Sequence, residues 1–170
     1  MKEDAQAKGH LVETVCTNDL QIKPCAGCMA CRTKGECLLS QDDSQRVLKM
    51  IQDADAVIMG APCYWGNIPG QMKLLFDRIV YGMMRDTPRF PQPLMKGKKC
   101  ILLSTCTTPW PWNIWFKQSR GAIRAMREIC RYAGFTRASL GRNFACSALP
   151  GTDLKVKNTN GQRSNSRDQH

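Results

Sequence analysis

Four cysteines fall within fourteen residues, in the stretch "PCAGCMACRTKGEC" at 24–37. The spacing is C-x2-C-x2-C-x5-C, and the thiols belong to Cys25, Cys28, Cys31 and Cys37. Four thiolates in one short loop suit a [4Fe–4S] cluster, although the last spacer is longer than in a ferredoxin run and Leu38, not proline, follows it. Zinc fits less well because the thiols do not form two separated pairs. A cysteine loop without any metal is the third interpretation, and the residues alone leave these alternatives open.

Two further segments with chemical potential follow predicted buried strands. The apolar run at 54–62 leads into "CYWGN", where Tyr64 and Trp65 stand beside a glycine and an asparagine. Such a loop can set backbone N–H groups and a flat apolar wall against a planar heterocycle. The run at 100–104 leads into "TCTTP", whose hydroxyls and amides can bind ring or sugar oxygens. The alternative is that Tyr64 and Trp65 are core aromatics that cap the sheet.

The hydrophobic period predicts alternating strands and helices. Apolar alternation or continuous apolar runs indicate strands, and residues at i, i+3 and i+4 indicate amphipathic helices. The predicted strands lie at 10–17, 54–62, 100–104 and within 135–146, and the predicted helices lie at 40–54, from Pro69 to about 80, and at 119–134. The strand at 54–62 is expected to be buried on both faces. This order predicts an α/β fold with a parallel sheet covered by helices, and ligands at the carboxyl ends of its strands.

Length and composition predict one soluble domain. The 170 residues are 42% hydrophobic and 23% charged, which is typical of a globular chain with a core. The start, "MKEDAQAKGH", has no apolar signal region, so the ten cysteines are expected to be reduced and the protein cytoplasmic. The uncharged stretches are broken by Pro, Gly and Asn, which argues against a membrane span. We expect a folded domain at 1–153 and a disordered polar tail at 154–170.

The net charge of +11 is concentrated in the last third of the sequence. From Lys117 onward there are 11 basic residues and 3 acidic ones. Four arginines in the helix predicted at 119–134 share one face because they step by four, three and four residues: Arg120, Arg124, Arg127 and Arg131. This face could hold a nucleotide phosphate or an acidic partner, or it could simply be solvated. Nucleic acid is not predicted as a partner, because the tail lacks aromatic residues interleaved with its charges for base stacking.

Three stretches together resemble the flavodoxin-like NAD(P)H-dependent FMN reductase family, including its iron–sulfur flavoprotein branch. They are "IKPCAGCMACRTKGEC", "ADAVIMGAPCYWGNIPGQMKLLFDR" and "REICRYAGF", and the resemblance covers roughly 8–153. It implies a three-layer sandwich around a five-stranded parallel sheet of order 2-1-3-4-5, with FMN at the switch in strand order. It also implies an oxidoreductase, expected to be a homodimer, that passes electrons from NAD(P)H through FMN to a small-molecule or protein acceptor.

The resemblance also assigns residues to the cofactors. Those carried over as FMN contacts are Pro62, Cys63, Tyr64, Trp65, Gly66, Asn67, Thr105, Cys106 and Thr107. The spacing of the cysteine loop is similar to that of the iron–sulfur branch, although other members carry such a loop beside the flavin without a metal. No catalytic residue of the chain itself is predicted. The remaining cysteines considered, expected to be small core residues, are Cys16, Cys63, Cys100, Cys130 and Cys146.

The sequence departs from the family at its start. Relatives begin with a strand and a Gly/Ser-rich turn whose amides hold the FMN phosphate at a helix N-terminus. No such segment is found before the cysteine loop, so the first strand is expected to be missing. The chain is accordingly interpreted as a fragment, a misplaced start or a degenerate paralogue. Two alternative functions follow: an iron–sulfur electron-transfer flavoprotein, or a catalytically silent partner.

Overall fold

The structure is a computed structural model that describes residues 2–108, 112–116, 119–137 and 144–145. The tail predicted at 154–170 and Cys146 lie outside the described residues.

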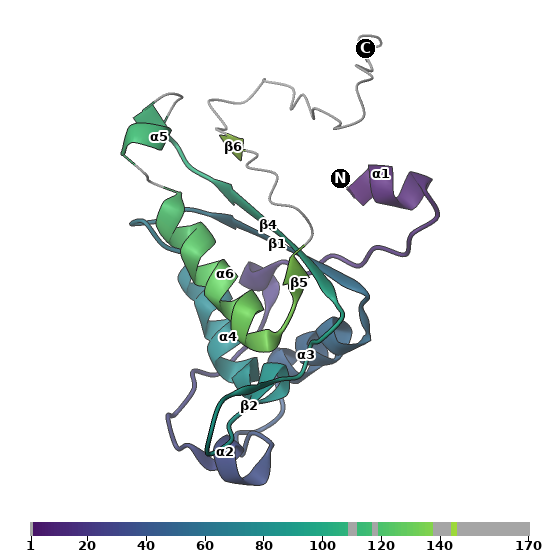
Figure 1. The fold of residues 1–170 in the computed structure, drawn as a ribbon, viewed down its shortest axis with the longest axis vertical. Helices are drawn as coiled ribbons and strands as arrows, with labels where there is room; N and C mark the ends of the chain where they lie inside the picture. The colour runs from purple at the N-terminus through teal and green to yellow at the C-terminus, as the bar shows by residue number, and fades with distance from the viewer. Residues whose placement is uncertain (1, 109–111, 117–118, 138–143, 146–170) are drawn as a thin grey trace.

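The sheet is parallel and centres on two long strands (Figure 1). Strand β1 (Ala56–Pro62) pairs with β4 (Lys99–Thr105) in register along their whole length. Two short strands also run parallel to β4: β5 (Thr136–Arg137) at its beginning and β6 (Phe144–Ala145) at its end. The predicted strands at 54–62 and 100–104 are confirmed, and the last predicted strand is present as two short pieces.

Three helices pack on one face of this sheet. They are α3 (Asp43–Asp53), α4 (Gly70–Met83) and α6 (Arg120–Ala133), and they lie side by side in Figure 1. Each begins or ends where the sequence predicts. Asp42 caps α3 in a capping box with Gln45. The side chain of Asp42 accepts the backbone N–H of Gln45, and the side chain of Gln45 accepts the backbone N–H of Asp42. Beyond α6, Gly134 ends the helix with a φ of 87°.

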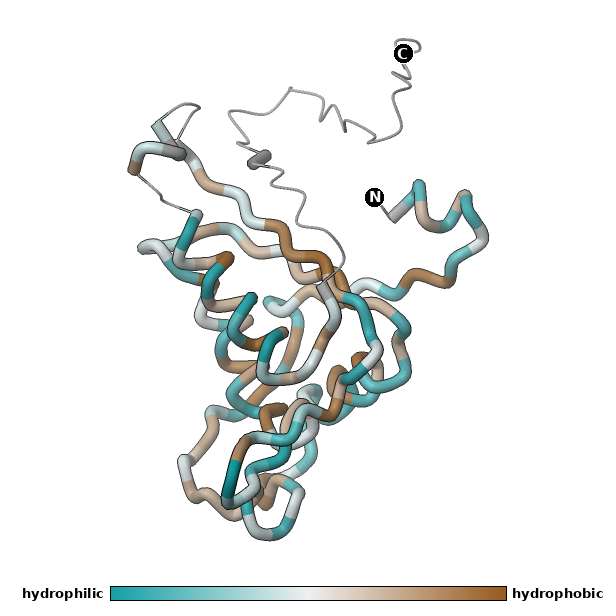
Figure 2. The backbone as a smooth tube through the Cα atoms, in the orientation of Figure 1, coloured by the Kyte–Doolittle hydropathy of each residue, from teal (hydrophilic) through white to brown (hydrophobic). Residues whose placement is uncertain are grey.

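The core lies between these helices and the sheet. On β1 the helix-facing residues Met59 and Ala61 are buried, whereas Ile58, which precedes Met59 and faces the other way, is 48% exposed. The expectation that this strand is buried on both faces is therefore wrong: in the described part of the chain, α3, α4 and α6 all cover the same face. Figure 2 shows the apolar (brown) stretch of the paired strands.

The cysteines expected in the core divide into two groups. Cys100 and Cys130 are buried, and the Cys130 thiol lies 3.9 Å from the sulfur of Met59. Burial, together with the neighbouring thiol of Cys100, raises the pKa of Cys130 well above its usual range. Cys16 is exposed, so its assignment to the core is wrong, and Cys63 is only half-buried. Cys16 lies on a segment without strand structure, where no layer covers it.

The segment predicted as a strand at 10–17 is irregular. It follows helix α1 (Lys2–Ala7) and runs into a 3₁₀ turn, η1 (Thr17–Asp19), while Leu11 is 93% exposed. An alternating pattern forms a strand only beside a partner strand, and the described residues offer none here. This prediction is therefore wrong.

Short elements complete the described structure. Helix α2 (Ala30–Lys34) lies within the cysteine loop, and α5 (Trp112–Trp115) follows β4. Strands β2 (Met84–Arg85) and β3 (Gln92–Pro93) form a separate antiparallel pair. None of the helices described is both long and apolar enough to cross a membrane.

Candidate functional site

A tight turn leaves the carboxyl end of β1. The backbone N–H of Tyr64 donates to the carbonyl of Asn67 at 3.0 Å, and the N–H of Asn67 donates back to Tyr64 at 2.9 Å. Between them, Trp65 has a φ of 50° and Gly66 a φ of 75°. Two successive positive φ angles are the signature of a type I′ turn. Gly66 adopts this conformation without cost, whereas Trp65 does not.

The second predicted loop lies beside this turn. Pro62 and Thr105, the last residues of β1 and β4, are register partners, and the N–H of Cys63 donates to the carbonyl of Thr105 at 2.7 Å. Thr105 is half-buried, Cys106 is buried and Thr107 is exposed. The two segments that the resemblance assigned to the flavin therefore meet at one edge of the sheet, as parallel strands require.

The two aromatic side chains of the turn point into solvent. Trp65 is 105% exposed relative to its reference state and Tyr64 is 61% exposed. The alternative that they are core aromatics is therefore wrong. A left-handed conformation costs a non-glycine residue roughly 1–3 kcal/mol, and an exposed tryptophan gains no burial to offset it. An observed strained residue with an unburied aromatic ring points to a function outside folding.

Helix α6 supports the turn from behind. A Cβ added at Gly121, in the first turn of the helix, would lie 1.7 Å from the carbonyl oxygen of Gly66. Only glycine permits this approach of the two backbones. The position of the turn is therefore fixed by direct contact with the start of α6.

Replacing Gly121 by alanine should destabilise the protein by roughly 1–3 kcal/mol, because the helix and the turn must separate. In an unobstructed helix the same change stabilises by up to about 1 kcal/mol, so the sign of the effect is diagnostic. The measurement is urea unfolding. Gly60→Ala serves as the control because an added Cβ there meets nothing within 4 Å. A stabilised Gly121→Ala variant would show that the contact with Gly66 is absent.

The four thiols of the cysteine loop do not gather. Cys25 and Cys28 are exposed, and Cys31 and Cys37 are half-buried. Cys31 and Cys37 both lie near Tyr81. Burial raises the pKa of the Tyr81 phenol, and the charges of these two thiols raise it further. Cys25 instead lines an apolar groove of about 420 Å³ between α4 and α6. Among the residues described, no three His, Cys, Asp or Glu side chains form a group that could hold a metal.

Four cysteine sulfurs are suitable ligands for a [4Fe–4S] cluster, but in this structure they do not lie together around one site.

A buried ion pair holds the entrance to the cysteine loop. The guanidinium of Arg78, on α4, donates from Nη2 to Asp42 Oδ2 at 2.9 Å, and the two side chains are 0% and 8% exposed. Asp42 also accepts the backbone N–H of Lys23, two residues before Cys25, at 3.1 Å. Arg78 Nε and Nη1 have no hydrogen-bond partner among the described residues. The sequence offers Ser40, Asp42 and Asp43 as candidate caps for α3. The helical period places Arg78 off the apolar stripe of α4, so its burial is not predicted.

Burial would raise the pKa of Asp42, but several hydrogen bonds and a charge outweigh it. The carboxylate accepts the hydroxyl and N–H of Ser44 and the N–H of Lys23, and the charge of Arg78 lies beside it. The pKa of Asp42 consequently lies below its ordinary value of 3.8. Asp42 is thus ionised at neutral pH.

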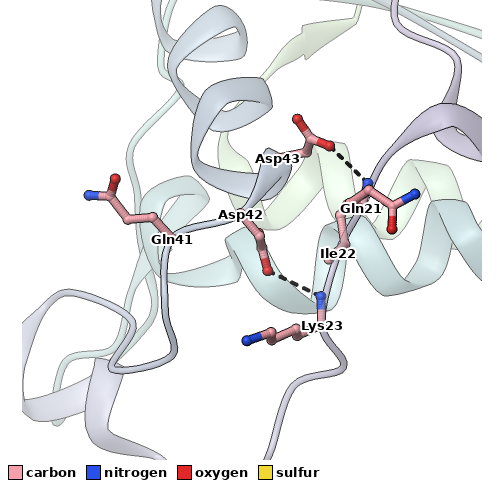
Figure 3. A pocket seen from close by; sticks show the side chains of 6 residues that line it. All are labelled: Gln21, Ile22, Lys23, Gln41, Asp42 and Asp43. Atoms are coloured by element: carbon pink, nitrogen blue, oxygen red, sulfur yellow. Dashed lines mark hydrogen bonds between the residues drawn. The ribbon is translucent and has the colours of Figure 1, made fainter.

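A cavity of about 490 Å³ adjoins this ion pair (Figure 3). Asp42 and Asp43 accept the backbone N–H groups of Lys23 and Gln21 across it, at 3.1 and 2.8 Å. Both carboxylates are thereby used to fasten the 21–23 segment to the start of α3. We interpret this cavity as part of a structural clamp.

The parallel sheet with its covering helices has the flavodoxin-like fold, and the turn at 64–67 lies at the carboxyl edge where such sheets bind ligands. The same fold occurs in the FMN-dependent NADH-azoreductase of Bacillus anthracis strain Ames Ancestor, solved in complex with FMN, with a TM-score of 0.54. That match has 13% identity and covers 71% of this chain and 63% of the other. Residues 1–109 match the family described as NADPH-dependent FMN reductase, and the chain belongs to this family.

Curated relatives include iron–sulfur flavoproteins of archaea. One from Archaeoglobus fulgidus is 43% identical over 76 residues, which is 45% of this chain and 37% of the relative. Another, from Methanosarcina thermophila, is 38% identical over 78 residues, covering 46% of this chain and 40% of the relative. The chain thus spans about two fifths of the length of these relatives.

Proposed function

We propose that the turn at 64–67 and the loop at 105–107 bind the isoalloxazine ring of FMN, and that the protein is an FMN-dependent NAD(P)H oxidoreductase. Family membership supports the cofactor. The single observation that carries the assignment is Trp65, a fully exposed aromatic residue in a left-handed turn at the edge where parallel sheets bind ligands.

Each part of this edge has a role in the proposal. The rings of Tyr64 and Trp65 form an apolar wall against the flavin and exclude water from it. Backbone N–H groups of the turn and the hydroxyls of Thr105 and Thr107 hydrogen-bond the polar rim of the ring. Bound FMN supplies the hydride and electron chemistry, whereas the chain supplies binding and orientation.

The proposal concerns the ring and not the phosphate. Residues 2–24 contain no strand, and Gly9 is the single glycine among them. The described part of the chain therefore offers no equivalent of the Gly/Ser turn that relatives use at this position.

The experiment that tests the function is reconstitution of the full chain with FMN, followed by addition of NADPH or NADH. After reconstitution at high FMN concentration, we expect the protein to keep its flavin absorbance bands through gel filtration. Anaerobic addition of the nicotinamide should then bleach these bands. Retention of flavin without bleaching would leave the binding site intact but refute the reductase activity. We further propose that the protein acts as a cytoplasmic homodimer with a small-molecule or protein acceptor.

The second candidate is an iron–sulfur flavoprotein, favoured by the four-thiol spacing and by relatives of that name. It requires the cysteine loop to rearrange, since the thiols are apart in the structure.

If a cluster forms, anaerobically prepared protein should contain about four iron atoms per chain, and Cys28→Ser should lose them because one missing thiolate opens the site. Iron analysis with the broad absorbance of a cluster measures this. Thr33→Ser, in the same loop, is the matched control and should keep its iron. Wild-type protein without iron would exclude this candidate.

A further inference from the structure

Four arginines form a row along the outer face of α6, hereafter the arginine row: Arg120, Arg124, Arg127 and Arg131. All four are exposed, and at 100° per residue they lie within a 60° sector of the helix. The buried residues Ala122 and Ala133 of α6 lie on the opposite side. The row extends about 16 Å along the helix axis.

The arginine row has no anionic partner in the described part of the chain. None of the four guanidinium groups makes an ion pair or a hydrogen bond with a described residue. Other helices of the protein pair their surface charges: Arg46 with Asp43 at 3.1 Å, and Lys49 with Asp53 at 2.9 Å. Helices α3 and α4 thus carry ion pairs of their own, whereas the described residues of α6 form none.

Repulsion within the row opposes the stability of its helix, and Glu128, at i,i+4 from Arg124, offsets only part of it. Like charges at i,i+3 and i,i+4 destabilise a helix, and the row contains three such pairs in succession. Arg120 also places a cation in the first turn, where the helix dipole disfavours it. An arrangement that opposes local stability is best explained by an external anion.

The shape of the surface favours a macromolecule. The row lies on the convex side of a helix, whereas small ligands bind in concave pockets. Nucleic acid fits less well because no aromatic side chain interrupts the row for base stacking, and Glu128 lies beside it. A protein that presents a line of carboxylates matches the charge and the geometry.

We propose that the arginine row docks an acidic protein partner at the edge of the flavin site. Gly121, next to Arg120, contacts the turn through Gly66, so one end of the row adjoins the turn at 64–67. A partner seated on the row is thereby brought beside that turn. Its role as an electron-exchange partner rests on the proposed function, whereas the docking does not.

The test uses the full chain and two synthetic helical peptides of identical composition. One peptide carries glutamates at i, i+4, i+7 and i+11, and the other distributes them around the helix. The control variant carries four exposed, unpaired cations outside the row changed to glutamine: Lys34, Arg85, Arg89 and Lys99. The test variant carries the four arginines of the row changed to glutamine, so both variants lose the same charge.

We expect the aligned peptide to bind wild-type protein at least about five times more tightly than the distributed one at low salt. The row variant should lose about tenfold or more in this affinity, and the control variant less than about threefold. Equal losses in the two variants, or no preference between the peptides, would overturn the proposal. So would tighter binding of a 20-base-pair DNA duplex that the row variant abolishes.

Folding and flavin binding are checked separately. The row variant should unfold at an equal or higher temperature, because like-charge repulsion is removed. Titration of FMN into both variants reports on the proposed function alone. Loss of peptide binding by the row variant, with unchanged flavin binding, supports the docking surface. Failure of FMN to bind wild-type protein would refute the flavin site without affecting the peptide result.

Discussion

Replacing Asp42 by alanine should lower the free energy of unfolding by about 3–5 kcal/mol, the largest stability effect that we expect from a single side chain. The reason is the guanidinium of Arg78, which is fully buried and would lose its carboxylate at 2.9 Å. The α3 cap and the hydrogen bond from Lys23 would be lost as well. Urea unfolding measures the change.

Asp43→Ala is the matched control, because this neighbouring carboxylate is more exposed and pairs with Arg46 at the surface. It should cost only about 1 kcal/mol. Adding Arg78→Met to Asp42→Ala should restore much of the stability, since the uncompensated buried charge is removed. A loss below about 1 kcal/mol in Asp42→Ala would contradict the burial of this pair.

The same pair gives a pH dependence of stability. The pKa of Asp42 is lower in the folded protein than its ordinary value of 3.8, so the stabilisation is fully present above that value. It is lost as the pH falls through the folded pKa, because protonation is then favoured in the unfolded chain. Wild-type protein should therefore lose more stability between pH 6 and about pH 3 than Asp42→Ala does. Equal losses would show that folding does not lower the pKa of Asp42.

Replacing Trp65 by alanine should weaken FMN binding by about 1–3 kcal/mol, equivalent to roughly 5- to 150-fold in Kd. The ring makes no packing contact that folding requires, since it is 105% exposed. Stability should accordingly change by less than about 0.5 kcal/mol. Titration of flavin fluorescence and urea unfolding measure the two quantities on the same variant.

Two further variants separate a role in binding from a role in folding. Phe90→Ala removes another exposed aromatic ring, 80% exposed, and should leave the affinity unchanged. Trp65→Gly removes the ring and also the left-handed strain, so it should lose FMN affinity while gaining stability or keeping it. An unchanged FMN affinity in both Trp65 variants would contradict the assignment of this residue.

The elements with strong periodicity were predictable from the sequence. Helix α3 begins next to its predicted cap, Asp42, and α6 ends at Gly134, because caps and glycine act locally. The segment at 10–17 was not predictable, since strand formation depends on a neighbouring strand. The exposure of Ile58 has the same origin: an apolar run reports its own hydrophobicity, not whether a second layer covers it.

That the two segments of the candidate site lie side by side was predictable, but their detailed conformation was not. Strand order placed the segments after β1 and β4 at one edge, and the hydrogen bond from Cys63 to Thr105 confirms that they meet. The strain at Trp65 and its contact with α6 through Gly121 depend on tertiary packing that no local pattern reports. The buried Arg78 was missed because a charged residue beside an apolar stripe ordinarily reaches solvent.

Titration of FMN and of riboflavin into the full wild-type chain, followed by quenching of flavin fluorescence, tests the central claim most directly. Binding of the isoalloxazine ring at this edge predicts saturable one-to-one binding of both flavins, because FMN and riboflavin share that ring. Absence of saturable quenching by either flavin up to about 1 mM would contradict the claim that this edge of the sheet binds the flavin ring.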